Sequence, residues 1–213
     1  MRKTSENRNY ENVNKRRYAG TGEYDIPIIK PEQFDGCQFI GFNYASSCKK
    51  NREEKGIHFY LDDYQFIRLW NMIDRYLPML QTFKYVMTPD FSTYADFPLA
   101  LQIYNHYRKH WIGAYLQEKG VRVIPTISWS DEKSYKWCFD GELTHGVVSV
   151  SAIGTQMNKQ AKKLFIEGYQ EMIHRLHPET IIFYGPVPEE CTGNIVRINS
   201  FQEKFGEVDC NGR

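Results

Sequence analysis

The feature that most limits how this chain can fold is an alternation of short β-rich runs with longer helical patterns, which begins at about Cys37. Several of the β-rich runs are almost continuously apolar, as strands are when helices cover both faces of a sheet. Alternation of this kind is typical of βαβ units and therefore of a parallel sheet. We expect strands at residues 38–44, 83–87, 121–128, 147–151, 180–184 and 194–198.

Apolar residues spaced three and four apart predict helices between these strands, at about 62–80, 98–120, 132–139 and 158–176. Pro98 and Gly120 suit the first and last positions of the second helix, and Pro78 should distort the end of the first. Five or six β/α units are too few for a complete eight-unit barrel. We therefore predict an α/β fold with a mostly parallel sheet of five or six strands and flanking helices, either open or resembling part of a barrel.

Charge is distributed unevenly along the 213 residues. Residues 1–22 hold six Lys or Arg and two Glu, whereas the whole chain carries a net charge of only +1. This segment has no apolar periodicity, so we expect a disordered basic arm at 1–22, a single α/β domain at 23–200 and a polar C-terminal tail at 201–213. The arm would give weak, salt-dependent contact with nucleic acid.

Several protein classes are excluded. No window holds 18 uncharged apolar residues, and the N-terminus lacks an apolar signal region, so we expect neither membrane insertion nor export. Five cysteines without a C-x-x-C spacing indicate reduced thiols and a cytoplasmic location. The P-loop and dinucleotide fingerprints are absent, and His106 and His110 lack the Glu of H-E-x-x-H, so we expect no cofactor and no metal. No oligomeric state follows from the sequence.

Candidate functional residues follow the predicted strands, because ligands of parallel α/β sheets bind beyond the strand carboxyl ends. Asp90 and Ser92 come after the second strand, behind a stiffening proline. Asp90 suits a general base, a metal ligand or an acceptor for a ribose hydroxyl, and it equally suits an Asx-turn. We predict it as a catalytic residue and Ser92 as a ligand-binding one.

The third strand runs into the densest polar and aromatic strand end of the chain, Ser128, Trp129, Ser130 and Asp131. Ser128 and Trp129 point to opposite sides if the strand persists, so one can face a ligand while the other packs. Ser130 or Asp131 suits the N-cap of the short helix, whose free N–H groups also suit an anion. We predict Asp131 as catalytic and the other three as ligand-binding.

Three further ligand-binding candidates come from other segments. Ser151 ends the fourth strand before a loop of small residues, and Tyr184 ends the fifth strand at a Gly-Pro turn. We expect Arg108 to extend from a mainly buried stripe of the second helix and to need an anionic partner, with Asp90 or another strand-end carboxylate the expected one. We expect Asp90, Ser128 and Ser151 to converge at one edge of the sheet.

The chain also resembles a known family over roughly residues 25–186. The resemblance is carried by residues 103–108, 111–115, 123–131, 138–141, 148–151 and 183–185, together with Asp90-Phe91-Ser92. The family is an uncharacterised domain of unknown function found largely in phages, plasmids and integrated elements of Gram-positive bacteria. The resemblance implies a mobile-element origin, and hence the host cell cytoplasm for a phage-encoded copy, and it implies no reaction.

Together these features predict an accessory protein of a phage or mobile element that binds a small polar or phosphorylated ligand at the strand carboxyl ends. If it is an enzyme, which the sequence leaves open, hydrolysis or transfer at a phosphate or sugar is expected, with Asp90 as base, Trp129 as platform and the helix start at Asp131 holding the anion. One alternative is a nucleic-acid-binding protein in which the arm, Arg108 and Lys109 meet phosphate while Trp129 and Tyr184 stack bases. Another is an inhibitor of a host protein that acts through its surface.

Overall fold

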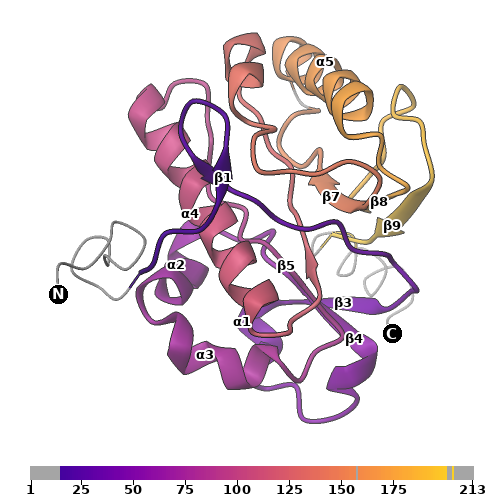
Figure 1. Cartoon of the computed structure of the whole chain (residues 1–213). Coiled ribbons are helices and arrows are strands. Elements are labelled where there is room, and N and C mark those ends of the chain that lie inside the picture. Colours follow the sequence, from indigo (N-terminus) through magenta and orange to yellow (C-terminus); the bar gives the residue numbers. More distant parts are fainter. Residues whose placement is uncertain (1–14, 157, 201–202, 204–213) are drawn as a thin grey trace, which may run out of the picture.

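Seven parallel strands, arranged in chain order, form the centre of the computed structural model, which describes residues 15–156, 158–200 and 203 (Figure 1). The first sheet contains β3 (Gln38–Gly41), β4 (Lys55–His58), β5 (Tyr85–Met87) and β6 (Val123–Ile124). The second contains β7 (Val147–Ser151), β8 (Thr180–Tyr184) and β9 (Ile195–Ile198). Every pairing within these two sheets is parallel, which confirms the predicted fold class.

The two sheets are joined at the carboxyl end of β6. Thr126 forms a parallel bridge with Ser149, and the Ile127 N–H donates to the Ser149 carbonyl at 2.8 Å. Inside the curve of the strands, the ring of Tyr60 stacks on that of Tyr184 at 4.6 Å, so the segment after β4 touches the end of β8. The array therefore resembles part of a barrel, and the described strands do not close it, since β3 and β9 do not pair with each other.

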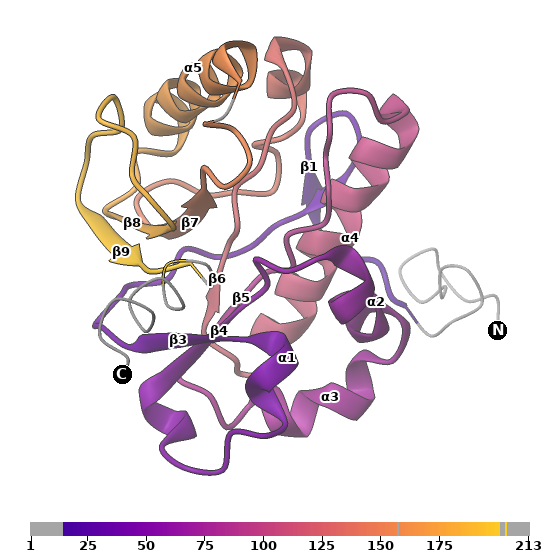
Figure 2. The same ribbon diagram turned by 180° about the vertical axis from the view of Figure 1, so that it is seen from behind.

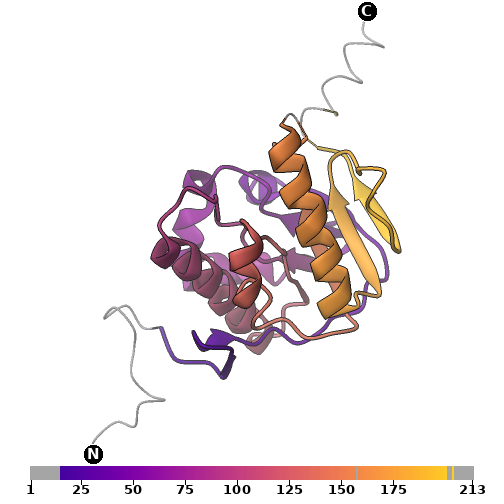
Figure 3. The ribbon, with the colours of Figure 1, turned by 90° about the horizontal axis from the view of Figure 1, so that it is seen from above.

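Helices cover the outside of this array (Figures 1 and 2). They are α1 (Phe42–Ala45), α2 (Asp63–Asn71), α3 (Ile73–Leu80), α4 (Leu99–Glu118) and α5 (Lys159–Leu176), with the 3₁₀ helices η2 (Arg52–Glu54) and η3 (Glu132–Lys136). Figure 3 shows α5 lying along the second sheet. The Asn158 side chain caps α5 by accepting from the Gln160 and Ala161 N–H groups, as the sequence leads one to expect for this residue type.

Successive side chains of a strand point to opposite faces of the sheet, and this divides the buried core into two clusters. On β8, Ile182 and Tyr184 pack with the cluster around the first sheet, whereas Ile181 and Phe183 pack with the cluster beneath α5. On β7, Val147 belongs to the first cluster and Val148 to the second. Ser149 and Ser151 therefore share the face of Val147, toward the inside of the curved array.

Some elements differ from the expected ones. Strand β4 was not predicted, because its sequence of Lys, Gly, Ile and His is neither an apolar run nor a clear alternation. The helix expected at 62–80 is two helices separated at Met72, whose backbone leaves the helical region with φ −141°. The strand expected at 121–128 pairs as a ladder only over Val123–Ile124, since Pro125 has no N–H to donate.

The terminal segments are only partly described. Residues 1–14 of the expected basic arm, and the expected tail at 201–213 apart from Glu203, lie outside the described residues. Residues 15–22 were expected to be part of the disordered arm, but they pack on the domain: the Lys15 ammonium lies 4.2 Å from the ring centre of Trp70, and the Trp111 indole N–H donates to the Arg16 carbonyl at 2.7 Å.

The chain then forms a short antiparallel hairpin of β1 (Gly20–Thr21) and β2 (Ile26–Pro27). The expectation of disorder rested on the lack of apolar periodicity, which takes no account of the contacts that Lys15 and Arg16 form with Trp70 and Trp111.

Among the described helices, none combines the length and the apolarity that crossing a bilayer requires.

Candidate functional site

A cleft of about 640 Å³ opens at the carboxyl ends of the parallel strands. Each of the seven strands ends in, or is followed by, at least one residue that lines the cleft. These are Asn43 and Tyr44 after β3; Tyr60, Leu61, Asp62, Asp63 and Gln65 after β4; Asp90, Phe91, Ser92, Thr93 and Tyr94 after β5; Ser128 and Trp129 after β6; Ser151, Ile153 and Thr155 at and after β7; Tyr184 ending β8; and Ser200 after β9. The cleft thus lies where parallel α/β folds place their ligands.

Asp90 is a half-buried side chain of this cleft. No hydrogen bond or ion pair joins its carboxyl group to another of the described residues, and the Asx-turn that the sequence also suits is not formed, because the Ser92 N–H donates to Asp63 instead. Burial raises the pKa of Asp90 to about 6, with the field of Lys109 opposing this rise and that of Asp63 adding to it. The carboxyl therefore changes its protonation state near neutral pH.

Asp63, the first residue of α2, has a different role. Its carboxylate accepts from the backbone N–H of Ser92 at 3.2 Å and from the Ser92 hydroxyl at 3.0 Å. The Asn105 side chain donates to the Ser92 carbonyl from α4. The polar groups of Ser92 are thus used to fix the loop that carries Asp90, although Ser92 also lines the cleft.

Lys109 of α4 is the cation behind the cleft. Its side chain is buried, and its ammonium donates to the Thr126 carbonyl at 2.8 Å and to the Ser128 hydroxyl oxygen at 3.3 Å. Burial lowers the pKa of Lys109, while the nearby carboxylates of Glu142 and Asp90 act to raise it. Because this ammonium is enclosed by the protein, it is not exposed to the nucleic-acid phosphate that the alternative function assigns to it.

Arg108 does not take the position expected of it. Its guanidinium lies 3.7 Å from the ring centre of Phe91, and Arg108 is not among the residues that line the cleft. The neighbouring residue Lys109 is the one whose charge acts on Asp90. Lys109 lies on a buried stripe at 102, 105, 109, 112 and 116, but three of these five residues are polar, so apolar spacing did not mark this face.

Tyr60 and Tyr184 form the aromatic wall on the inner side. The Tyr60 hydroxyl and the Ser149 hydroxyl are hydrogen-bonded, and the Tyr184 ring also lies 4.9 Å from that of His58. Burial raises the pKa of Tyr60 well above its ordinary value. Ser151 lies beside this wall, and its hydroxyl donates to the Tyr184 carbonyl at 3.1 Å. Tyr60 was missed because it follows β4, which the sequence did not reveal.

Of the four candidates at the end of the third predicted strand, two line the cleft and two do not. Ser128 and Trp129 line the cleft, and the Trp129 indole N–H donates to the Leu164 carbonyl of α5 at 3.2 Å. Gly168 is required beside that ring, because a Cβ there would lie 2.1 Å from the indole nitrogen. Ser130 and Asp131 do not line the cleft.

The hydroxyl of Ser130 and the carboxylate of Asp131 have partners within the protein. Ser130 donates to the Gln102 side chain at 2.7 Å, and Asp131 caps η3 by accepting from the Ser134 N–H. The helix start that Asp131 caps is therefore not part of the cleft, and η3 is a 3₁₀ helix of only five residues. The structure thus brings six candidates to the cleft, Asp90, Ser92, Ser128, Trp129, Ser151 and Tyr184, and places Arg108, Ser130 and Asp131 elsewhere.

The two histidines of α4 also have partners within the protein. His106 Nε2 lies 3.0 Å from the Asp140 carbonyl, and burial lowers the pKa of His106 well below its ordinary value. His110 Nδ1 lies 2.9 Å from the Pro27 carbonyl, and its Nε2 lies 3.0 Å from a buried Glu142 carboxylate oxygen. Within the described part of the chain, no group of three or more His, Cys, Asp or Glu side chains is arranged to hold a metal ion.

Residues 18–202 match a protein family described as a domain of unknown function, DUF4417. The chain belongs to this family. The match to DUF4417 extends beyond the roughly 25–186 expected from the sequence and includes all seven strand ends that line the cleft.

Two phage proteins are similar to this DUF4417 chain. The Gene 1 proteins of Mycobacterium phages D29 and L5 are each 33% identical to it over 169 residues, or 79% of this chain. The match covers 63% of the D29 protein and 74% of the L5 protein, so this chain spans less than two thirds of the D29 relative. The expected likeness to phage proteins is confirmed. No solved structure is significantly similar to the chain.

Proposed function

We propose that this DUF4417 chain binds a small polar ligand in the cleft and that the carboxyl group of Asp90 is the main hydrogen-bonding partner of that ligand. The observation that carries the proposal is the lack of any hydrogen bond or ion pair between Asp90 and the other described residues. Asp90 is half-buried, and removing a carboxyl group even partly from water without a partner is unfavourable. Such groups are concentrated at functional sites, where a ligand supplies the partner.

The charge of the lining favours a polar ligand over a phosphorylated one. Asp62, Asp63 and Asp90 line the cleft, and none of the described residues that line it is Lys or Arg. The buried ammonium of Lys109, whose charge acts on Asp90, is already bonded to Thr126 and Ser128. A phosphate would meet carboxylates without a cation to offset them. Of the two ligand types expected from the sequence, the small polar one therefore has the support of the geometry.

Asp90 also suits proton transfer. Its pKa of about 6 lies close to neutral pH, where a carboxyl group serves best as a general acid or base. Hydrolysis or transfer at a sugar, which the sequence analysis left open, would use it in this way. If the chain catalyses such a reaction, the protonation of Asp90 would set the pH dependence of the rate.

The proposal is tested by native mass spectrometry of the full chain purified from host cells, followed by mild denaturation to release bound molecules. Wild type is compared with Asp90→Asn and with Asp96→Asn, an exposed aspartate that follows the same strand and does not line the cleft. We expect one small molecule on wild type and on Asp96→Asn, and none on Asp90→Asn. Equal retention by Asp90→Asn, or no bound molecule on wild type, would contradict the proposal.

A further inference from the structure

The floor of the cleft pairs a hydrogen-bond acceptor with a donor. Asp90 and Ser128 follow β5 and β6, which are neighbours in the sheet. The Ser128 oxygen accepts from Lys109, and its own proton is donated to none of the described residues. A ligand hydroxyl can donate to a carboxylate and accept from a serine at the same time. The pair therefore suits the hydroxyl groups of a sugar ring.

The mouth of the cleft is aromatic and apolar. Tyr44 is 48% exposed and Tyr94 is 62% exposed, and both line the cleft together with Ile153, which is 45% exposed. These side chains come from α1, from the loop after β5 and from the segment after β7, so three separate elements place large apolar groups at one opening. Grouped exposed apolar side chains mark binding surfaces, and tyrosine rings stack on planar rings.

The charges of the lining disfavour a phosphate. The Asp63 carboxylate stays charged when it accepts from the N–H and the hydroxyl of Ser92, because both donors are neutral. Asp62 and Asp90 are also carboxylates of the lining, and none of the described residues that line the cleft is Lys or Arg. A phosphate would be repelled there, whereas the hydroxyl groups of an uncharged ligand can donate to these carboxylates.

We infer that the ligand is an uncharged molecule in which a hydroxyl-bearing sugar ring is joined to a planar ring, as in a nucleoside without a phosphate. The sugar lies on the floor at Asp90 and Ser128, and the planar ring lies at the mouth against Tyr44 and Tyr94. The volume of about 640 Å³ falls in the range of small-molecule sites and accommodates such a ligand. This inference rests on the proposed function, because it assumes that the cleft is the binding site.

The test measures the binding of defined probes to the full wild-type chain by isothermal titration calorimetry. The probes are adenosine, uridine, adenosine 5′-monophosphate, adenine, methyl riboside and a phenyl glucoside. We expect a nucleoside to bind, and its monophosphate, its base alone and methyl riboside to bind about tenfold more weakly or worse. Tighter binding of the phenyl glucoside than of either nucleoside would contradict the nucleoside assignment and indicate an aryl glycoside.

Variants locate the two ends of the bound molecule. Tyr94→Ala and Tyr44→Ala should each weaken nucleoside binding about tenfold, as loss of one stacking ring does, and leave methyl riboside binding unchanged. Tyr24→Ala, which removes an exposed tyrosine that does not line the cleft, should change neither.

The inference is overturned if the monophosphate binds as tightly as the nucleoside, if both tyrosine variants bind like wild type, or if no probe binds. It can fail while the proposed function stands: a molecule retained from host cells in a manner that depends on Asp90 would then be of another class. Asp90→Asn tested with the probe that binds best addresses the proposed function separately.

Discussion

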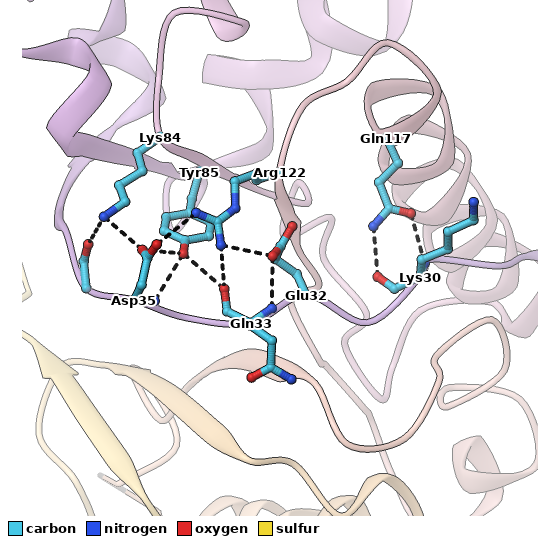
Figure 4. A network of polar contacts seen from close by, with 9 residues as sticks. Lys30, Glu32, Gln33, Asp35, Lys84, Tyr85, Gln117 and Arg122 are labelled. Carbon is cyan, nitrogen blue, oxygen red and sulfur yellow. Dashed lines mark hydrogen bonds and ion pairs between the residues drawn. The ribbon is translucent and has the colours of Figure 1, made fainter.

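The two ends of the same sheet each hold an aspartate, and the two aspartates differ in whether the described part of the protein supplies hydrogen-bond partners for the carboxyl group. At the amino ends of the strands, the Asp35 carboxylate accepts from the Lys84 ammonium at 2.8 Å, from the Tyr85 hydroxyl at 2.7 Å and from the Arg122 guanidinium at 3.1 Å (Figure 4). At the carboxyl ends, Asp90 has no such bond to a described residue. The comparison separates a carboxylate that serves the fold from one that is available to a ligand.

The pKa values follow from this difference. Hydrogen bonds from Lys84, Tyr85 and Arg122 hold the pKa of Asp35 well below its ordinary value, although the side chain is exposed. Burial without such bonds raises the pKa of Asp90 to about 6. Hydrogen-bond partners, and not exposure alone, therefore decide which protonation state each of the two aspartates favours.

The network at the amino ends also joins distant parts of the chain. Arg122 donates to Glu32 at 3.0 Å and to the Gln33 carbonyl at 2.9 Å, and its guanidinium lies 4.3 Å from the ring centre of Tyr85. In Figure 4 the segment that carries Glu32, Gln33 and Asp35 passes beside the side chains of Tyr85 and Arg122. This end of the sheet is therefore fixed by contacts within the protein itself.

The largest effect is expected for Lys109, a buried cation that serves the fold behind the carboxyl ends. Lys109→Met removes the charge-assisted bonds to the Thr126 carbonyl and to Ser128, and we expect a loss of about 2 to 3 kcal/mol in the free energy of unfolding at pH 7. It should also raise the pKa of Asp90 further, since the Lys109 field lowers it. Urea unfolding measures the first effect.

Lys119→Met is the matched control for this change, because Lys119 follows the same helix and its side chain is 41% exposed, whereas that of Lys109 is buried. It should leave the unfolding free energy within about 0.5 kcal/mol of wild type. A Lys109→Met chain as stable as this control would show that the carboxyl ends need no cation.

Asp90→Asn should stabilise the protein at high pH. The native pKa of about 6 lies above the ordinary value of 3.8, so the native state binds more protons than the unfolded state between these values, and wild type loses stability as the pH rises through 6. Because the side chain is only half-buried, we expect a gain of about 1 to 2 kcal/mol for the variant at pH 8 and little difference at pH 4. Thermal unfolding across this pH range measures the difference. Destabilisation of the variant at pH 8 would indicate a structural partner for Asp90.

The smallest effect is expected at the amino ends. Arg122→Ala removes bonds to Glu32, Gln33 and Asp35 from a side chain that is 37% exposed, so we expect a loss of about 1 kcal/mol, or about 2 to 4 °C in Tm. Retention of the small molecule should not change. Loss of that molecule from a folded Arg122→Ala chain would break the division of roles between the two ends.

Sequence reasoning succeeded where one physical rule dominates. Strands β7 and β8 match their predicted bounds, because strands buried on both faces give continuous apolar runs. The rule that parallel strands present their carboxyl ends at one edge brought Asp90, Ser128 and Ser151 to a single cleft. Neither result required knowledge of the long-range contacts.

The failures have physical causes as well. In α4, Trp111 is buried on one side and Lys109 on another, so the apolar pattern does not identify the inner face and Arg108 was placed there instead. The exposed rings of Tyr44 and Tyr94 carry no sequence pattern that marks them as neighbours of a cleft. Three-dimensional proximity alone reveals these residues.

The most direct test of the central claim is a carbon NMR titration of the side-chain carboxyl groups, with Asp90 and Asp35 assigned from the spectra of Asp90→Asn and Asp35→Asn. If Asp90 has no partner within the protein, its midpoint lies near pH 6, while that of Asp35 lies well below the ordinary range. A midpoint for Asp90 at or below its ordinary value of 3.8 would mean that the protein itself pairs this carboxyl group, and would contradict the account.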